Sequence, residues 1–212
     1  MASYETITGS VEAEYEDRRS RFICRLTPAA DEETARAAIS EVRTLRWDAR
    51  HHCTAFVLGP DRATRRSSDD GEPSGTAGAP ILQSLIGSGL TDLVAVVTRY
   101  FGGTLLGSGG LVRAYGTATR LALDAVVRRR FVQADLVRVV ADHGDAPRLE
   151  NELRELGVEV IKIDYAARVT LQLAVLDHQA ARVAALVASI THGRSEVTVI
   201  GTSWRPAPLQ SG

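Results

Sequence analysis

The chain has 212 residues, 44% of them hydrophobic, and a formal net charge of −1. This is the composition of an ordinary globular protein with one large or two small domains, and it lacks the strongly basic charge typical of nucleic-acid binders. With no run of about 18 apolar residues, no signal-peptide pattern and only two cysteines, we expect a cytoplasmic protein without a membrane span or a disulfide framework.

The first half of the chain predicts strands and helices in turn. Residues 5–15 and 20–27 have strand patterns, separated by a turn at 17–19. Asp31 suits the N-cap of a helix, whose expected buried stripe is Ala35, Ala38, Ile39, Val42 and Leu45. Then follow a strand at 52–58, a polar loop from Gly59 to Gly75, a short helix beginning near Pro80, a strand at 93–97 and a long helix from Gly109 to Val127. The inward side chains of that long helix are predicted to be Leu111, Ala114, Tyr115, Ala118, Leu121, Ala122 and Ala125.

The apolar run at 93–97 predicts a central strand that is covered on both faces. From residue 131 the pattern predicts strand 134–141, helix 146–156, strands 159–163 and 167–175, helix 178–190 and strand 196–201. That order is the βαββαβ plan of ferredoxin-like domains. The arginine run at 128–130 marks the expected boundary, which gives an α+β protein with domains at 1–130 and 131–206 and a tail at 207–212.

A glycine-rich turn joins the predicted central strand to the long helix, and we call residues 99–115 the mouth. Five glycines lie within nine residues of it. Backbone N–H groups at the start of a helix attract anions, but the spacing fits neither a P-loop nor a GxGxxG fingerprint. The expected binding residues are Arg99, Tyr100, Gly102, Gly103, Gly107, Gly109, Gly110, Arg113 and Tyr115. The alternative is a tight connection beside a solvated face that carries Arg113, Thr117 and Arg120.

The loop at 67–78 is rich in acidic and turn-forming residues. Asp70 and Glu72 are candidates for a general acid–base pair, and His51 is a third catalytic candidate that would lie near them in space. Carboxylates also bind hard cations, yet the spacing of an EF-hand is absent, and no zinc-type CxxC or HExxH spacing is present. We therefore expect no metal site and no cofactor. The alternative is a turn whose acids cap backbone N–H groups.

Three ordered motifs together resemble the IMPACT/YigZ family, in its bacterial form. They are the segments Asp48-Ala49-x-His51-x-Cys53, residues 69–78, and residues 97–115. The resemblance implies a ribosomal-protein-type α+β domain followed by a ferredoxin-like domain similar to those near the end of elongation factor G. It also implies eukaryotic relatives that regulate translation by competing for the activator of the amino-acid-starvation kinase through an additional N-terminal domain, which we do not expect in this chain.

The leading hypothesis is a non-enzymatic, translation-associated regulatory protein. Its mouth would bind RNA, the ribosome or a translation factor, with Arg99 and Arg113 contacting phosphate-type anions. The alternative is an enzyme acting on a phosphate-bearing small molecule or nucleotide at the mouth, with Asp70 and Glu72 as acid–base groups or metal ligands. A third hypothesis is an adaptor that binds a protein through an exposed apolar patch.

Overall fold

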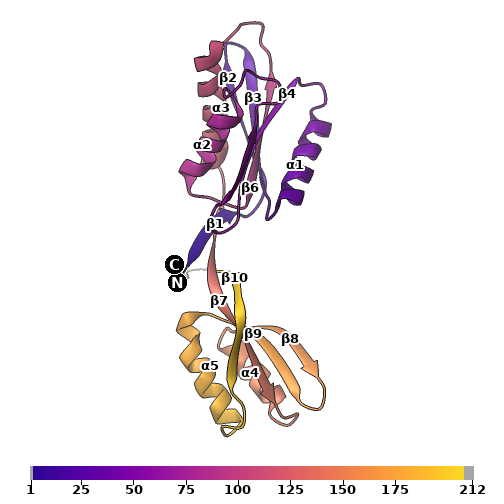
Figure 1. Ribbon diagram of the computed structural model, residues 1–212, viewed down its shortest axis with the longest axis vertical. Helices are drawn as coiled ribbons and strands as arrows, with labels where there is room; N and C mark the ends of the chain where they lie inside the picture. Colours follow the sequence, from indigo (N-terminus) through magenta and orange to yellow (C-terminus); the bar gives the residue numbers. More distant parts are fainter. Residues whose placement is uncertain (1, 208–212) are drawn as a thin grey trace. The chain divides into compact units, whose positions relative to one another are not determined.

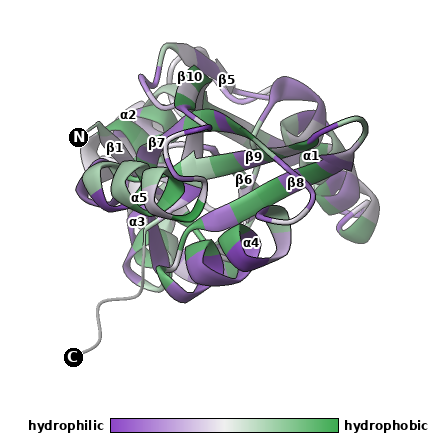
Figure 2. Cartoon of the chain, turned by 90° about the horizontal axis from the view of Figure 1, so that it is seen from below, coloured by the Kyte–Doolittle hydropathy of each residue, from purple (hydrophilic) through white to green (hydrophobic). Residues whose placement is uncertain are grey.

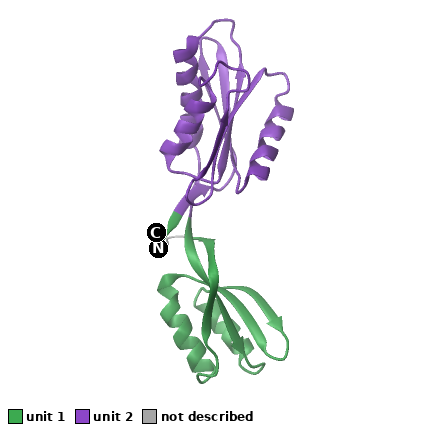
Figure 3. Cartoon of the chain, viewed as in Figure 1, with its two compact units in different colours: residues 1–3, 131–212 green, residues 4–130 purple. Residues whose placement is uncertain are grey.

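In the computed structural model, residues 2–207 are described, so the predicted tail at 207–212 lies outside the described residues except for its first residue. The chain divides into two compact units (Figure 3), one spanning Tyr4–Arg130 and the other Phe131 onward together with the first residues. Strands and helices are interspersed along the chain, and the strands form two antiparallel sheets (Figure 1), which confirms the α+β fold class. No helix among residues 2–207 is long and apolar enough to cross a membrane.

The unit Tyr4–Arg130 contains a five-stranded sheet with helices on both faces. Its strands, in spatial order, are β2 (Val11–Asp17), β3 (Ser20–Pro28), β6 (Leu93–Tyr100), β4 (His51–Leu58) and β5 (Thr64–Ser68). Helices α2 (Gly78–Ser88) and α3 (Gly107–Asp124) pack on one face, and α1 (Glu32–Leu45) packs on the other. Strand β6 is therefore central and covered on both sides, as its apolar run predicts.

Helix α1 begins where the sequence predicts. The Asp31 side chain accepts a hydrogen bond from the Thr34 backbone N–H at 2.8 Å, and the Thr34 hydroxyl accepts one from the Asp31 backbone N–H at 3.2 Å. Ala35, Ala38 and Val42 are buried, but Leu45 is exposed because it is the last residue of the helix.

Several predicted boundaries are wrong. Residues 5–15 form two strands, β1 (Ser3–Ile7) and β2, separated near Gly9. The predicted loop at 59–75 contains β5, whose polar Thr-Arg-Arg-Ser-Ser sequence has no apolar alternation to reveal it. Leu121 and Ala125 are exposed rather than inward, since α3 ends at Asp124 and presents Leu121 to solvent.

The arginine run at 128–130 is the beginning of a long strand, β7 (Arg128–Ala141), with which β1 also pairs. Then come α4 (Ala146–Glu155), β8 (Glu159–Tyr165), β9 (Val169–Val175), α5 (Asp177–Ile190) and β10 (Val197–Pro206). The strands pair antiparallel in the order β10-β7-β9-β8, which is a ferredoxin-like βαββαβ sheet. In Figure 2, α4 carries both hydrophobic and hydrophilic colours, as expected for a helix with one buried face.

Candidate functional site

The acidic loop between β5 and α2 contacts the mouth. Arg99 Nη1, at the end of β6, donates to Glu72 Oε1 at 2.7 Å. The Tyr115 hydroxyl, in α3, donates to the same oxygen at 2.7 Å. These contacts bring together three residues that the sequence places in separate segments.

Arg99 lies in the interior rather than at the surface of the mouth. Its side chain is 8% exposed and that of Glu72 is 3% exposed. The guanidinium carbon of Arg99 lies 5.5 Å from the ring centroid of Phe22 and 5.6 Å from that of Phe101. The expected role of Arg99 as a direct phosphate contact is therefore revised: its charge is matched by Glu72, and the pair fastens the acidic loop to the central strand.

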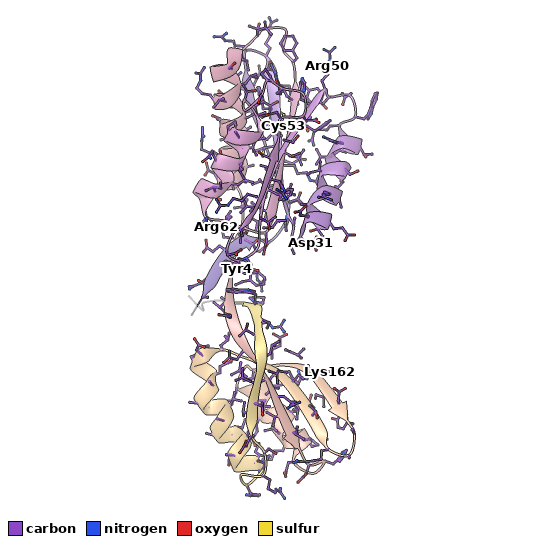
Figure 4. The ribbon with its side chains drawn as sticks, viewed as in Figure 1. Tyr4, Asp31, Arg50, Cys53, Arg62 and Lys162 are labelled. Carbon is purple, nitrogen blue, oxygen red and sulfur yellow. The ribbon has the colours of Figure 1, made fainter. Side chains whose placement is uncertain are left out.

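Cys53, which is labelled in Figure 4, contacts the buried cluster formed by Glu72, Arg99 and Tyr115. The Cys53 sulfur lies 3.0 Å from the Asp69 carbonyl oxygen and 3.3 Å from the Tyr115 hydroxyl. Burial raises the pKa of the Cys53 thiol to about 12, so the thiol stays protonated at neutral pH. His51 Nδ1 contacts the Asp70 carbonyl oxygen at 2.9 Å. No Cys–His nucleophile pair is formed here.

The candidate acid–base residues are engaged in holding the loop. One Asp70 carboxylate oxygen accepts from Arg43 at 2.6 Å, and the other accepts from the His52 backbone N–H at 2.7 Å. Glu72 accepts from Arg99 and Tyr115. Within residues 2–207, no group of three or more His, Cys, Asp or Glu side chains is placed to hold a metal ion.

Asp69 caps the beginning of α2. Its carboxylate accepts from the backbone N–H groups of Gly75 (2.9 Å), Ala77 (3.0 Å) and Gly78 (2.8 Å). Burial opposes ionisation of Asp69, but the three N–H donors outweigh it and hold the pKa below the ordinary value. A carboxylate thus occupies the place where an external anion would meet this helix.

The predicted binding glycines have different structural roles. A Cβ atom on Gly102 would overlap the backbone of Arg19 and Ser20, so only glycine fits there. Gly103 and Gly107 adopt positive φ angles of 87° and 71°. Gly109 and Gly110 lie in the first turn of α3. That turn has no acidic residue and no side-chain cap, so its N–H groups keep a positive potential.

Of the two arginines predicted to bind at the mouth, Arg113 is the one that the structure leaves exposed. Its guanidinium nitrogens lie close to where Cβ atoms on Gly109 and Gly110 would be, at 3.9 and 4.0 Å. One and two turns further along the helix lie Thr117 and Arg120, and Arg120 donates to the Thr117 hydroxyl at 2.9 Å. In the described part of the chain, neither arginine has an acidic partner within ion-pair distance.

A groove of about 820 Å³ runs between α2 and α3, and we call it the α2–α3 groove. Its lining residues are Gly75, Ala79, Pro80, Gln83, Ser84, Gly87, Ser88, Val112, Arg113, Gly116, Arg120, Leu123, Asp124 and Arg128. The two helices lie close together at Gly116, where a Cβ would touch the Ser84 hydroxyl (3.8 Å) and Pro80 Cβ (3.9 Å) at ordinary contact distances and would lie 3.2 Å from Arg120 Nη1. The α2 wall of this groove could not be predicted from the sequence, because which helix faces pack together depends on tertiary contacts.

The fold and cluster define a two-unit α+β protein whose halves both match known families. Residues 18–123 match the model of the Impact N-terminal domain, and residues 139–194 match that of a domain of unknown function (DUF1949). The chain belongs to the IMPACT family, which confirms the resemblance seen in the sequence.

Two bacterial relatives are similar to this protein over most of the chain. The chain is 37% identical to IMPACT family member YvyE of Bacillus subtilis (strain 168), over 93% of this chain and 91% of that protein. It is 38% identical to IMPACT family member YigZ of Escherichia coli (strain K12), over 87% and 92%. A crystal structure described as that of a hypothetical protein superposes with a TM-score of 0.76 at 37% identity, covering 94% of this chain and 98% of that one.

Proposed function

We propose that this protein is a cytoplasmic, translation-associated regulator that binds the phosphate backbone of RNA, including ribosomal RNA, in the α2–α3 groove. The observation that carries this proposal is the pair Arg113 and Arg120, which are exposed on one face of α3 and have no acidic partner among the described residues. Arginine presents a planar fork of donors that suits phosphate.

The spacing of the two arginines fits a polyanion. Seven residues of α-helix rise about 10.5 Å, so Arg113 and Arg120 can contact two different phosphates along one strand. The start of α3 adds the positive end of its helix dipole on the Arg113 side. By contrast, Arg25, Arg43 and Arg46 are all neutralised by carboxylates.

The family supports the translation part of the proposal, because IMPACT proteins are associated with translation regulation. The net charge of −1 implies a local basic site rather than a basic surface. We therefore expect binding that weakens steeply with salt. The alternative enzyme gains no support from Asp70 and Glu72, whose carboxylates already accept hydrogen bonds inside the protein.

The test is co-sedimentation of the full chain with ribosomes at low and high salt. An Arg113→Ala/Arg120→Ala variant removes two charges from the groove. Its matched control, Arg36→Ala/Arg182→Ala, removes two exposed arginines from α1 and α5. Circular dichroism establishes that both variants are folded.

Wild type and control should pellet at low salt and be released at high salt, and the groove variant should stay in the supernatant. Each lost phosphate contact should lower the slope of log affinity against log salt by about 0.7 to 0.9. Equal pelleting of the groove variant and the control would refute the groove as the contact surface. No pelleting of wild type at low salt would refute ribosome binding.

A further inference from the structure

Aromatic side chains are exposed where β6 ends and the mouth begins. Trp47 is 82% exposed and Phe101 is 54% exposed. The two chain segments that carry these residues are joined, because the hydroxyl of Tyr100, which precedes Phe101, donates to Oδ1 of Asp48, which follows Trp47, at 3.0 Å. We call Trp47, Tyr100 and Phe101 the aromatic end of this unit. Alternation along β6 places Tyr100 on the α1 face together with Val94 and Val96. Phe101 follows the strand and lies against Arg99, which belongs to the opposite face.

Phe101 is held in place despite its exposure. Arg99 lies over its ring, and Arg99 is itself fixed by Glu72. The next residue, Gly102, donates its backbone N–H to the Ser20 hydroxyl at 3.0 Å, and its Cα packs directly against the Arg19 backbone. The ring is thus pre-positioned, which lowers the entropy cost of binding something on its open side.

Tyr100 is oriented in a similar way. The guanidinium carbon of Arg21 lies 5.8 Å from its ring centroid, and Arg21 is paired with Glu14. Two neighbouring rings at one strand end therefore each have an arginine over the ring.

The surroundings of the aromatic end carry unpaired positive charge. Arg18 and Arg19, in the β2–β3 turn, and Arg50, before β4, are exposed and have no ion-pair partner among residues 2–207. Arg19 lies directly beside Gly102. Proteins that bind single-stranded nucleic acid combine such arginines with aromatic rings on which bases stack. A protein partner would also use aromatic anchors, but the uncompensated arginines favour a polyanion.

We infer that the aromatic end binds unpaired bases of single-stranded RNA, with Phe101 and Trp47 as stacking residues and Arg18, Arg19 and Arg50 as backbone contacts. This inference rests on the proposed RNA binding and adds a preference that the groove alone does not give. Double-stranded RNA buries its bases and is recognised mainly by shape and backbone, so it offers nothing for these rings to stack on.

The experiment measures binding of a fluorescently labelled 12-nucleotide RNA by anisotropy, as a single strand and as a duplex with its complement. The variants are Phe101→Ala, Trp47→Ala and the control Val127→Ala, which truncates an exposed apolar residue away from the aromatic end. In a Trp204→Phe background, Trp47 is the sole tryptophan of the chain. Quenching of its fluorescence by RNA then reports stacking directly.

The single strand should bind at least tenfold more tightly than the duplex and should quench Trp47. Phe101→Ala and Trp47→Ala should each weaken single-strand binding by about 5- to 150-fold, the equivalent of 1–3 kcal/mol per stacked base. The slope against salt should not change in these variants, whereas Arg113→Ala/Arg120→Ala should lower it. Val127→Ala should bind as wild type does.

Equal binding of single strand and duplex, unchanged by Phe101→Ala and Trp47→Ala, would overturn this inference and leave groove binding standing. Trp47 is so exposed that its truncation tests the inference even if Phe101→Ala misfolds. Ribosome pelleting that depends on Trp47 without any single-strand preference would assign the aromatic end to a protein partner and overturn the RNA inference. No binding of either RNA or of ribosomes would overturn both proposals.

Discussion

Replacing Glu72 by glutamine should destabilise the unit Tyr4–Arg130 strongly, because it leaves Arg99 charged and buried without its counter-ion. The two side chains are 8% and 3% exposed. Among the described residues, Arg99 Nε already has no hydrogen-bond partner, so the guanidinium has little else to compensate its charge. Breaking a buried pair by removing one partner costs about 3–5 kcal/mol, whereas an exposed pair contributes about 0–1 kcal/mol. Tyr115 also loses a charged acceptor, and this loss overlaps with the first rather than adding to it.

The assay is urea unfolding followed by far-UV circular dichroism, with Glu32→Gln as the matched control. Glu32 forms an exposed pair with Arg36 in α1, so its loss should lower the free energy of unfolding by less than about 1 kcal/mol. A Glu72→Leu/Arg99→Met variant removes both charges and should recover much of the loss, because the buried arginine is gone. If Glu72→Gln cost no more than Glu32→Gln, the pair would not be what fastens the acidic loop to β6.

Three further predictions concern the same unit. Gly102→Ala should lower the free energy of unfolding by at least about 1–3 kcal/mol in urea unfolding, because its Cβ would overlap the Arg19 backbone; an unchanged stability would show that the turn moves freely. Asp69→Ala should cost about 1–2 kcal/mol at pH 7 by loss of the α2 cap. The pKa of Asp69 is lower in the folded protein than in the unfolded chain, so this stabilisation is present above the unfolded pKa of about 3.9 and is lost as the pH falls through the folded pKa. A difference in the free energy of unfolding between wild type and Asp69→Ala that stayed constant down to pH 2 would contradict the cap. Cys53, with its pKa raised to about 12 by burial, should react with a thiol reagent at pH 8 only after unfolding, and rapid labelling of the native protein would contradict its burial.

The sequence singles out the mouth and the acidic loop as separate segments, but it does not show that they meet or which of their residues are in contact. The clustering of glycine, arginine and acidic residues marks the mouth and the loop, and those two segments do meet. Nothing local distinguishes Arg99 from Arg113, although one is buried against a carboxylate 27 positions earlier and the other is exposed. Likewise, nothing in the chain distinguishes Asp69 from Asp70. Asp69 caps α2, whereas Asp70 accepts hydrogen bonds from Arg43 and from the His52 backbone N–H in β4.

Apart from β1 and β5, the sequence by itself determined the order of elements, together with the α1 cap at Asp31, the central position of β6 and the IMPACT family, because periodicity, capping residues and long ordered motifs are local signals. The sequence analysis predicted a loop where β5 forms, because the residues of β5 show no apolar alternation. It also predicted Leu121 to face inward, although this side chain is exposed. Only the tertiary structure decided which charges are buried, that Gly102 is needed for close packing, and that α2 and α3 form a groove with two arginines that have no acidic partner among residues 2–207. Those properties depend on contacts between segments far apart in the chain, and such contacts leave no periodic trace in the sequence.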